Sequence, residues 1–353
     1  MYETLSTQVV SRVYPAEWSP QSAILMAWPH QGTDWAEILD SVADVYVRIV
    51  SAISQHERVV LLCQDDAHQG AITHQLKQAG VNIRQIIFQP IQYNDTWTRD
   101  YGPLSILQNG QPQLLDFVFN GWGNKFTADD DDQVNQILNA RGVWSDIPLE
   151  SIDYILEGGS VDTDGQGTLM TTSACLLNDN RNPQANKESV EVLLADKLGC
   201  QRLLWLDHGY LAGDDTDSHI DTLARFCSVD SIVYMACEQP DDEHFNALKQ
   251  MEEEIKTFRT GDGRAYQLFP INIPPPIYDE DKQRLPASYV NFLVINSAVL
   301  VPVYGDEPSD RAAIKQLTRA FPRHEIIAID CKPLIMQHGS LHCVTMQWIQ
   351  GVI

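Results

Sequence analysis

The chain has few basic side chains for the number of acidic ones. Its 353 residues include 24 Lys and Arg against 48 Asp and Glu, which gives a formal net charge of −24 and a pI of about 4.6. Phosphate backbones and anionic lipid surfaces repel such a chain. We therefore expect neither a nucleic-acid partner nor a membrane partner, whereas the same field favours a cationic small molecule as ligand.

Cysteine is sparse and scattered, and long hydrophobic runs are missing. The seven cysteines are odd in number and contain no C-x-x-C pair, so the sequence predicts neither a disulfide framework nor a structural zinc site. No stretch approaches the roughly 18–20 apolar residues that cross a bilayer. The N-terminal residues also lack the basic and then apolar pattern of a secretion signal. We therefore expect a cytoplasmic protein, and the sequence leaves open whether it assembles with copies of itself.

Strand and helix patterns alternate along the whole chain. Short runs rich in Val, Ile and Leu, bounded by Gly, Pro, Asn or Asp, predict strands, and apolar residues at i, i+3 and i+4 predict helices. No Pro/Gly/Ser-rich linker divides the chain, so we expect a single α/β domain. No G-x-G-x-x-G follows a strand, which argues against a Rossmann sheet. The expected strands are 59–63, 103–107, 114–119, 168–172, 203–206, 232–236, 290–295, 298–303 and 325–329, and the expected helices are 35–55, 66–79, 132–140, 187–198, 243–256 and 309–320.

Five segments combine reactive or charged side chains with glycines or aromatic residues in ways that core packing does not require. Carboxylates, an imidazole and a thiol are the groups that perform acid–base and nucleophilic chemistry. The five segments are N-D-T-W-T-R-D-Y-G-P (94–103), L-E-G-G-S-V-D (156–162), G-D-D-T-D-S-H-I-D-T-L-A-R-F (213–226), S-Y-V-N-F (288–292) and Q-H-G-S-L-H-C-V-T-M-Q (337–347).

The first and third segments also have simpler interpretations. The first could be a turn in which Arg99 forms a salt bridge with Asp95 or Asp100. In the third, His219 and Asp221 would share one face of a strand, and the neighbouring aspartates suggest a metal site. No second histidine lies at metal-ligand spacing nearby, which argues against that metal site.

The other three segments each centre on one polar side chain. Glu157 precedes two glycines, where the backbone can approach a ligand closely or simply form a surface turn. Asn291 lies in an otherwise apolar strand pattern and needs a hydrogen-bond partner, either a ligand or the local backbone. Cys343 is either a quiet core thiol or, in an open loop near a base, a reactive thiolate.

In their order along the chain, these segments resemble the agmatine deiminase and bacterial-type peptidylarginine deiminase family of guanidino-group-modifying enzymes. The likeness covers nearly the whole chain. It implies a pseudo-fivefold α/β propeller (pentein-like) and a single catalytic deiminase domain over residues 1–353, with loops from distant parts of the sequence around a central site. The motifs that carry it are A-W-P-H (27–30), W-x-R-D-x-G-P (97–103), F-N-G-W-G (119–123), E-G-G (157–159), T-D-S-H-I-D (216–221), S-Y-V-N-F (288–292) and H-C (342–343).

The resemblance implies a catalytic role for five residues. Cys343 would attack the guanidinium carbon and form a covalent thiouronium intermediate that water hydrolyses. His219 would protonate the departing ammonia and then activate the water, with Glu157 orienting His219. Asp100 and Asp221 would pair with guanidinium nitrogens and hold the carbon over the sulfur. Neither a metal nor an organic cofactor is implied, because the guanidinium is already a charged electrophile.

The resemblance also implies a substrate site formed by Trp97, Asp215 and Asn291 beside Asp100 and Asp221. The Trp97 ring suits a cationic chain, and Asp215 matches the position whose carboxylate approaches the distal ammonium of agmatine. We therefore expect agmatine to give N-carbamoylputrescine and ammonia, a step towards putrescine and other polyamines. Similar enzymes usually carry Glu at position 215 and a glycine-rich run where this chain has H-G-S-L (338–341). Peptidyl-arginine, converted to citrulline, is therefore the alternative substrate.

Two other classes remain as alternatives. One is a metallohydrolase built on the Asp- and His-rich third segment, which insensitivity to chelators and inactivation by a thiol-directed haloacetamidine would exclude. The other is a non-catalytic protein that binds polyamines or other cations. A binding protein has no need of a thiol, so the presence of Cys343 argues against the second class.

Overall fold

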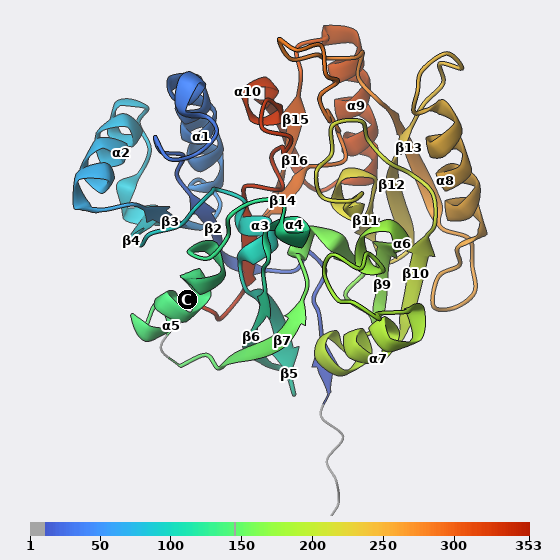
Figure 1. The fold of residues 1–353 in the computed structure, drawn as a ribbon, viewed down its shortest axis with the longest axis horizontal. Helices are drawn as coiled ribbons and strands as arrows, with labels where there is room; N and C mark the ends of the chain where they lie inside the picture. The colour runs from blue at the N-terminus through green and yellow to red at the C-terminus, as the bar shows by residue number, and fades with distance from the viewer. Residues whose placement is uncertain (1–10, 145) are drawn as a thin grey trace, which may run out of the picture.

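The computed structural model describes residues 11–144 and 146–353 (Figure 1). Strands and helices are mixed along this whole length, which confirms the predicted α/β class. The expected helix 187–198 and the expected strands 168–172 and 298–303 have the observed bounds. In the part of the chain that is described, no helix combines the length and the apolar character that crossing a bilayer requires.

The strands of the described residues form five separate sheets that repeat one unit. In each unit, two strands pair antiparallel and a third pairs parallel to the second. A parallel neighbour needs a long crossover, and a helix supplies it each time. The units comprise β5 (Leu104–Gln108), β6 (Gln111–Val118) and β7 (Leu149–Ile155); β8 (Val161–Thr163), β9 (Thr168–Thr172) and β10 (Arg202–Leu206); β11 (Ala224–Ser228), β12 (Ser231–Ala236) and β13 (Gln267–Asn272); β14 (Leu293–Ile295), β15 (Ala298–Val303) and β16 (Glu325–Asp330); and β17 (Met346–Ile349), β2 (Gln21–Ala27) and β3 (Arg58–Cys63).

The fifth unit joins segments from the two ends of the described chain. Strand β17 pairs antiparallel with β2, with Met346 opposite Leu25, and β2 pairs parallel with β3. Two further strands extend the sheets at their edges: β4 (Ile86–Pro90) beside β3, and β1 (Arg12–Val13) beside β5. The pairing of β17 with β2 closes the series of units on itself.

The crossover helices cover the sheets with one apolar face each. In α1, the buried residues Val42, Tyr46, Ile49 and Ile53 recur at helical spacing. The central strands are buried on both faces and therefore read as continuous apolar runs, as in β12. The crossover helices are α5 (Val134–Ala140), α7 (Lys187–Leu198), α8 (Phe245–Thr257), α9 (Glu307–Ala320) and α1 (Leu39–Ile53); α2 (Asp66–Gln78) leads to β4, and the short helices are α3 (Thr98–Tyr101), α4 (Gly121–Asn124), α6 (Ser173–Leu176) and α10 (Lys332–Ile335).

Two expectations about strands in the site segments are wrong. The expected strand 290–295 begins only at Leu293, so Asn291 lies in the loop before β14. His219 and Asp221 do not lie on a strand either, because Asp221 belongs to a 3₁₀ turn (Ile220–Thr222) that precedes β11 and His219 caps that turn. Asn291 and the pair His219 and Asp221 therefore lie on loops that lead into the first strand of a unit, β14 and β11 respectively.

Candidate active site

The predicted site residues come from equivalent places in the five units. Each of the five segments singled out in the sequence leads into the first strand of a unit, that is β5, β8, β11, β14 or β17. The structure brings these five loops together, although they are far apart in the sequence. They carry Asp100, Glu157, His219 with Asp221, Asn291 and Cys343.

A cavity of about 170 Å³ lies where these loops meet, and Cys343 and His219 are part of its wall. Six aspartates line it, and no Lys or Arg of the described chain does. Three aromatic side chains complete much of the wall. Such a cavity favours a cation with an apolar stem. The aspartates are Asp34, Asp95, Asp100, Asp214, Asp215 and Asp221, and the aromatic residues are Trp97, Trp122 and Phe126.

His219 is buried between two carboxylates. Its Nδ1 lies 3.6 Å from Asp100 Oδ1, and its Nε2 lies 3.8 Å from Glu157 Oε2. Burial opposes the charged imidazole, but the carboxylate of Asp100, the adjacent Cys175 and the carboxylate of Glu157 outweigh it and raise the pKa of His219 well above its ordinary value. The imidazole is therefore held in the form that can donate a proton.

Asp100 is fixed by two N–H donors. The indole of Trp122 donates to Oδ2 at 3.0 Å, and the backbone N–H of Gly159 donates to Oδ1 at 2.9 Å. Burial raises the pKa of Asp100, while the neighbouring His219 lowers it. A side chain at residue 159 has no room, because its Cβ would lie 2.6 Å from His219 Nδ1 and 2.8 Å from Asp100 Oδ1. This contact explains the second glycine of E-G-G.

Asp221 is held from behind by a chain of buried charged groups. Its Oδ2 lies 2.7 Å from His342 Nδ1, and His342 Nε2 lies 2.8 Å from Glu17 Oε2. Burial raises the pKa of Asp221, but the hydrogen bond and charge of His342 outweigh burial and lower it. The other oxygen, Oδ1, is buried without a partner among the described residues. It can therefore accept an N–H from a bound guanidinium.

Cys343 is the one cysteine of the chain that lines the cavity, although all seven are buried. Its Sγ lies 3.5 Å from Asn291 Oδ1, which also accepts the backbone N–H of His342 at 2.9 Å. Burial, followed by the carboxylates of Asp221 and Asp100, raises the pKa of the Cys343 thiol well above its ordinary value. A cation placed between these aspartates would favour the thiolate.

The structural alternatives for two segments can now be compared with the contacts. The expected salt bridge of Arg99 with Asp95 or Asp100 is wrong, because the buried guanidinium faces Glu17 at 3.9 Å. For Asn291, the hydrogen bond to the backbone of His342 is present. Its Nδ2 nevertheless has no partner among the described residues. Asn291 thus holds the loop that carries the thiol, and its Nδ2 amide group can still donate to a ligand.

Trp97 and Asp215 lie in the cavity wall as expected for substrate-binding residues. The Trp97 ring occupies the space where a side chain at residue 339 would be, since a Cβ on Gly339 would lie 2.0 Å from the ring. The Asp215 carboxylate is 3.8 Å from His338 Nδ1 and its side chain is 43% exposed. Burial raises the pKa of Asp215, and His338 partly offsets this effect. The Asp215 carboxylate is therefore open to a ligand in the cavity and has the His338 ring beside it.

The donor set that most resembles a metal site does not fit a metal ion. Glu157, Cys175 and His219 place an oxygen, a sulfur and a nitrogen atom within 4.8 Å of one another, and zinc accepts such ligands. However, both oxygens of Glu157 already accept hydrogen bonds from Arg181 Nε. Neither Glu157 nor Cys175 lines the cavity. The three groups therefore form a buried polar cluster behind the cavity.

Three buried residues of this region were missed by the sequence reasoning: Glu17, Cys175 and Arg181. Glu17 lies in P-A-E-W-S-P and Arg181 in N-D-N-R-N-P, contexts in which a single charge looks like an ordinary loop residue. Their partners are distant in the sequence, since Glu17 contacts His342 and Arg181 contacts Glu157. The only available signal was an isolated charge between turn-forming residues.

The comparisons with known proteins agree with this geometry. The family model of Porphyromonas-type peptidyl-arginine deiminases matches residues 13–348. The chain belongs to this family. It is 30% identical to the agmatine deiminase of Stutzerimonas stutzeri over 94% of each chain. It is also similar to the solved structure of a Cys-to-Ser variant of C. jejuni agmatine deiminase with substrate bound, at 37% identity, a TM-score of 0.91 and coverage of 99% of each chain. A crystal structure named provisionally as a peptidyl-arginine deiminase is 45% identical, with a TM-score of 0.91, over 96% of this chain and 99% of that one.

Proposed function

We propose that the chain is an agmatine deiminase, which hydrolyses the guanidinium of agmatine to N-carbamoylputrescine and ammonia. The observation that carries this proposal is the meeting of Cys343, His219, Asp100 and Asp221 in one cavity whose lining has six aspartates. A guanidinium is planar and permanently charged, and its N–H groups form a fixed fork that suits paired carboxylates. The thiol of Cys343 then supplies the nucleophile. The imidazole of His219, whose pKa is raised, supplies the acid.

The first half of the reaction forms a covalent intermediate. Asp100 and Asp221 accept N–H groups of the substrate and place its central carbon against the sulfur. The substrate charge favours the thiolate of Cys343, whose sulfur forms a C–S bond to that carbon. His219 gives its proton to one nitrogen, the C–N bond breaks and ammonia leaves. The product of this half is an S-alkylthiouronium.

The second half restores the enzyme. His219, now neutral, takes a proton from water as the water oxygen adds to the thiouronium carbon. The C–S bond then breaks, the sulfur leaves as thiolate, the remaining hydroxyl proton passes to solvent and the neutral ureido product departs. Glu157 stays ionised beside His219, because the nearby imidazole of His219 and the charge of Arg181 lower its pKa despite burial.

The outer part of the cavity supports agmatine as the substrate. Asp215 and Asp214 lie in the wall with Asp34 and Asp95, where they would attract the distal ammonium of agmatine. Free arginine carries a carboxylate, which these acids would repel. The relatives from S. stutzeri and C. jejuni are themselves named agmatine deiminases.

Peptidyl-arginine remains the second candidate substrate. It is favoured by the 45% identity to a structure named provisionally as a peptidyl-arginine deiminase. It is also favoured by Phe126 at the cavity, which is 44% exposed and could contact a peptide backbone. The uncharged backbone of a peptide would not need Asp215.

Ammonia release from the purified protein tests the proposal. We expect kcat/KM for agmatine to exceed that for free arginine and for an acylated arginine amide, and Cys343→Ala to remove turnover while agmatine binding stays measurable by calorimetry. The three substrates share the guanidinium, so only their distal ends are compared. Faster turnover of the acylated amide would favour the second candidate, and undiminished turnover by Cys343→Ala would contradict the nucleophile.

The setting of the reaction follows from its chemistry. We propose that residues 1–353 act as one catalytic domain, because the site draws on loops from residue 17 to residue 343. The product retains the carbon chain of putrescine, which places the step in putrescine and polyamine biosynthesis. The seven free cysteines support a reducing compartment such as the cytoplasm.

A further inference from the structure

Arg181 is a buried arginine that the mechanism above does not use as a reacting group. It lies in the loop after α6, and its side chain is 1% exposed. Its Nε donates to both oxygens of Glu157, at 2.8 and 2.9 Å. Because Glu157 faces His219 Nε2 at 3.8 Å, Arg181 stands directly behind the carboxylate that orients the imidazole.

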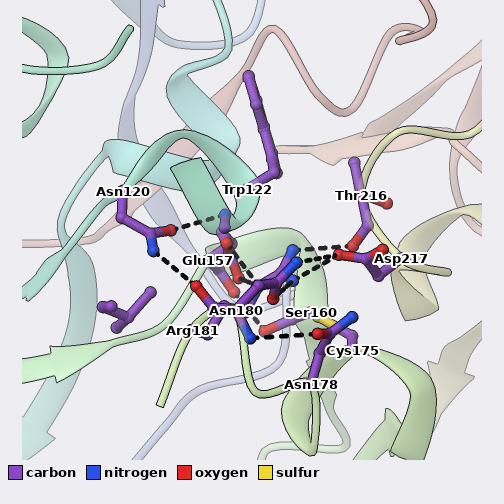
Figure 2. Close-up of polar contacts among 12 residues, drawn as sticks. Asn120, Trp122, Glu157, Ser160, Cys175, Asn178, Asn180, Arg181, Thr216 and Asp217 are labelled. Atoms are coloured by element: carbon purple, nitrogen blue, oxygen red, sulfur yellow. Dashed lines mark hydrogen bonds and ion pairs between the residues drawn. The ribbon is translucent and has the colours of Figure 1, made fainter. Parts of the chain in front are cut away.

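The far edge of the same guanidinium binds the loop that carries His219. Nη1 donates to Asp217 Oδ2 at 2.6 Å, and Nη2 donates to the carbonyl oxygen of Thr216 at 2.9 Å. Figure 2 shows Arg181 between Glu157 on one side and Thr216 with Asp217 on the other. All three nitrogens of one side chain therefore join Glu157 to the segment just before His219.

That segment has an unusual backbone. Asp217 and Ser218 both have positive φ, at 63° and 68°. Residues other than glycine adopt such angles only where their surroundings hold them. Asp217 also pairs with Lys125 Nζ at 2.9 Å. The Asp217 side chain thus anchors the strained turn from which His219 projects.

We propose that Arg181 is a positioning residue that keeps Glu157 and the His219 loop in register with each other, so that the imidazole can alternate between acid and base. This inference rests on the proposed function, because it concerns the same acid–base step. Arg181 does not line the cavity, and its contacts with Glu157, Thr216 and Asp217 are therefore its means of acting on the reaction.

The charge of Arg181 has a consequence for pH dependence. The ionisable groups that face Glu157 are Arg181, His219, Cys175 and Asp100. Burial raises the pKa of Glu157, while His219 and Arg181 outweigh burial and lower it. Removal of the Arg181 charge raises the pKa of Glu157, so Glu157 becomes protonated at a higher pH. The acidic limb of the kcat profile then moves to higher pH.

Three variants separate charge from geometry in a kcat–pH profile measured with agmatine. Arg181→Gln should lose roughly 10²-fold in kcat and move the acidic limb to higher pH, since a positioned acid–base group contributes roughly 10²–10⁴-fold. Arg181→Lys keeps the charge but not the three-way contact, so kcat should fall while the acidic limb stays in place. Asp217→Asn leaves the Glu157 contact intact and should lower kcat by roughly tenfold with an unmoved limb.

Arg12→Gln is the matched control. Arg12 lies on β1 and forms a salt bridge of 2.7 Å with Glu150 on β7, and neither residue lines the cavity. This variant should leave both kcat and its profile unchanged. If Arg181→Gln folds and the acidic limb of its kcat profile lies at the same pH as in the wild-type protein, the proposal is overturned. If Arg181→Gln does not fold, wild-type kcat in folded Arg181→Lys or Asp217→Asn overturns it. Absence of ammonia release by the wild-type protein from any guanidino substrate would instead contradict the proposed function.

Discussion

The Cys343 thiol lies against two carboxylates in a buried site. Burial and the carboxylates of Asp221 and Asp100 raise the pKa of Cys343 well above its ordinary value, so little thiolate exists at neutral pH without a bound cation. A cationic ligand between the carboxylates offsets this effect. The nucleophile should thus form together with substrate binding.

We expect this dependence to show in alkylation rates. Neutral iodoacetamide should inactivate the enzyme slowly at pH 7 and faster as the pH rises above 9, because the raised pKa delays thiolate formation. A cationic 2-haloacetamidine should react at least tenfold faster at pH 7, since it supplies the missing charge. Inactivation of the wild-type protein can be followed by ammonia release, and mass spectrometry of treated Cys343→Ala controls for labelling elsewhere. Equal rates for the two reagents at pH 7 would contradict the argument.

Asp215 allows a test of substrate choice at a single side chain. Asp215→Asn keeps the size of the side chain and removes the charge that would meet the distal ammonium of agmatine. We expect kcat/KM for agmatine to fall by roughly tenfold, the order of a charge-assisted contact of about 1.5 kcal/mol. The value for an acylated arginine amide should change little. Parallel losses on both substrates would show that Asp215 acts on the guanidinium end instead.

At the scale of single residues, the sequence predicted the groups that line the cavity and are proposed to react, but not the residues that hold them. Cys343, His219 and Asp100 occur in recognisable motifs, and the structure brings them to one cavity. Glu17 and Arg181 carry no local pattern, because their roles depend on contacts with His342 and Glu157 across the fold. Only the folded chain shows that each of these charges has a partner.

The short elements at the strand entries set tight limits on side-chain size. Gly159 contributes its backbone N–H to Asp100 and leaves no room for a methyl group beside His219. We expect Gly159→Ala to lower kcat by roughly 10²-fold, because small misplacements of reacting groups have effects of this size. Gly70→Ala is the matched control.

Gly70 lies inside α2, and a Cβ there would meet no atom within 4 Å. Gly70→Ala should keep full activity and raise the free energy of unfolding by about 1 kcal/mol, because alanine favours a helix interior over glycine. Urea denaturation and ammonia release measure the two effects. An unchanged kcat in Gly159→Ala would contradict this prediction, because it would mean that the His219 loop can shift to accommodate the methyl group without loss of activity.

At the scale of elements, long buried strands and amphipathic helices could be predicted, and the short pieces could not. The expected bounds of α7 are the observed ones, because Val190, Leu194 and Leu198 recur every four residues between the capping residue Asn186 and the left-handed Gly199 that ends the helix. Strand β8, three residues long, offers no periodicity to recognise. The same is true of the turn at Asp221, where H-x-D alone wrongly favoured a strand.

At the scale of the whole molecule, the fivefold repeat was expected only from the family resemblance, because the sequence shows no repeat of fixed period. The connections between strands differ in length from unit to unit, so equivalent residues do not recur at a fixed period. What the units share is a hydrogen-bonding pattern, with one antiparallel and one parallel pairing in each. Strand pairing is made by backbone hydrogen bonds, and the amino-acid sequence therefore shows little sign of it.

The net charge of −24 predicts a dependence on salt. Charges of one sign repel one another in the compact state, and salt screens this repulsion. We expect Tm to rise by about 2 °C or more between 10 and 200 mM NaCl, and KM for agmatine to increase over the same range. Differential scanning fluorimetry with KCl in place of NaCl controls for binding of a particular cation. A Tm that falls with either salt would contradict the prediction.

The pairing of β17 with β2 has a consequence for biosynthesis. The loop that carries Cys343 precedes β17, and β17 leaves the ribosome after the loops that carry Asp100, Glu157 and His219 are already made. A chain that stops before this loop can therefore present aspartates to polyamine-like cations but lacks Cys343, the cysteine that lines the cavity. If Cys343 is the nucleophile, activity should appear only after β17 has paired with β2, so that activity reports a closed series of units.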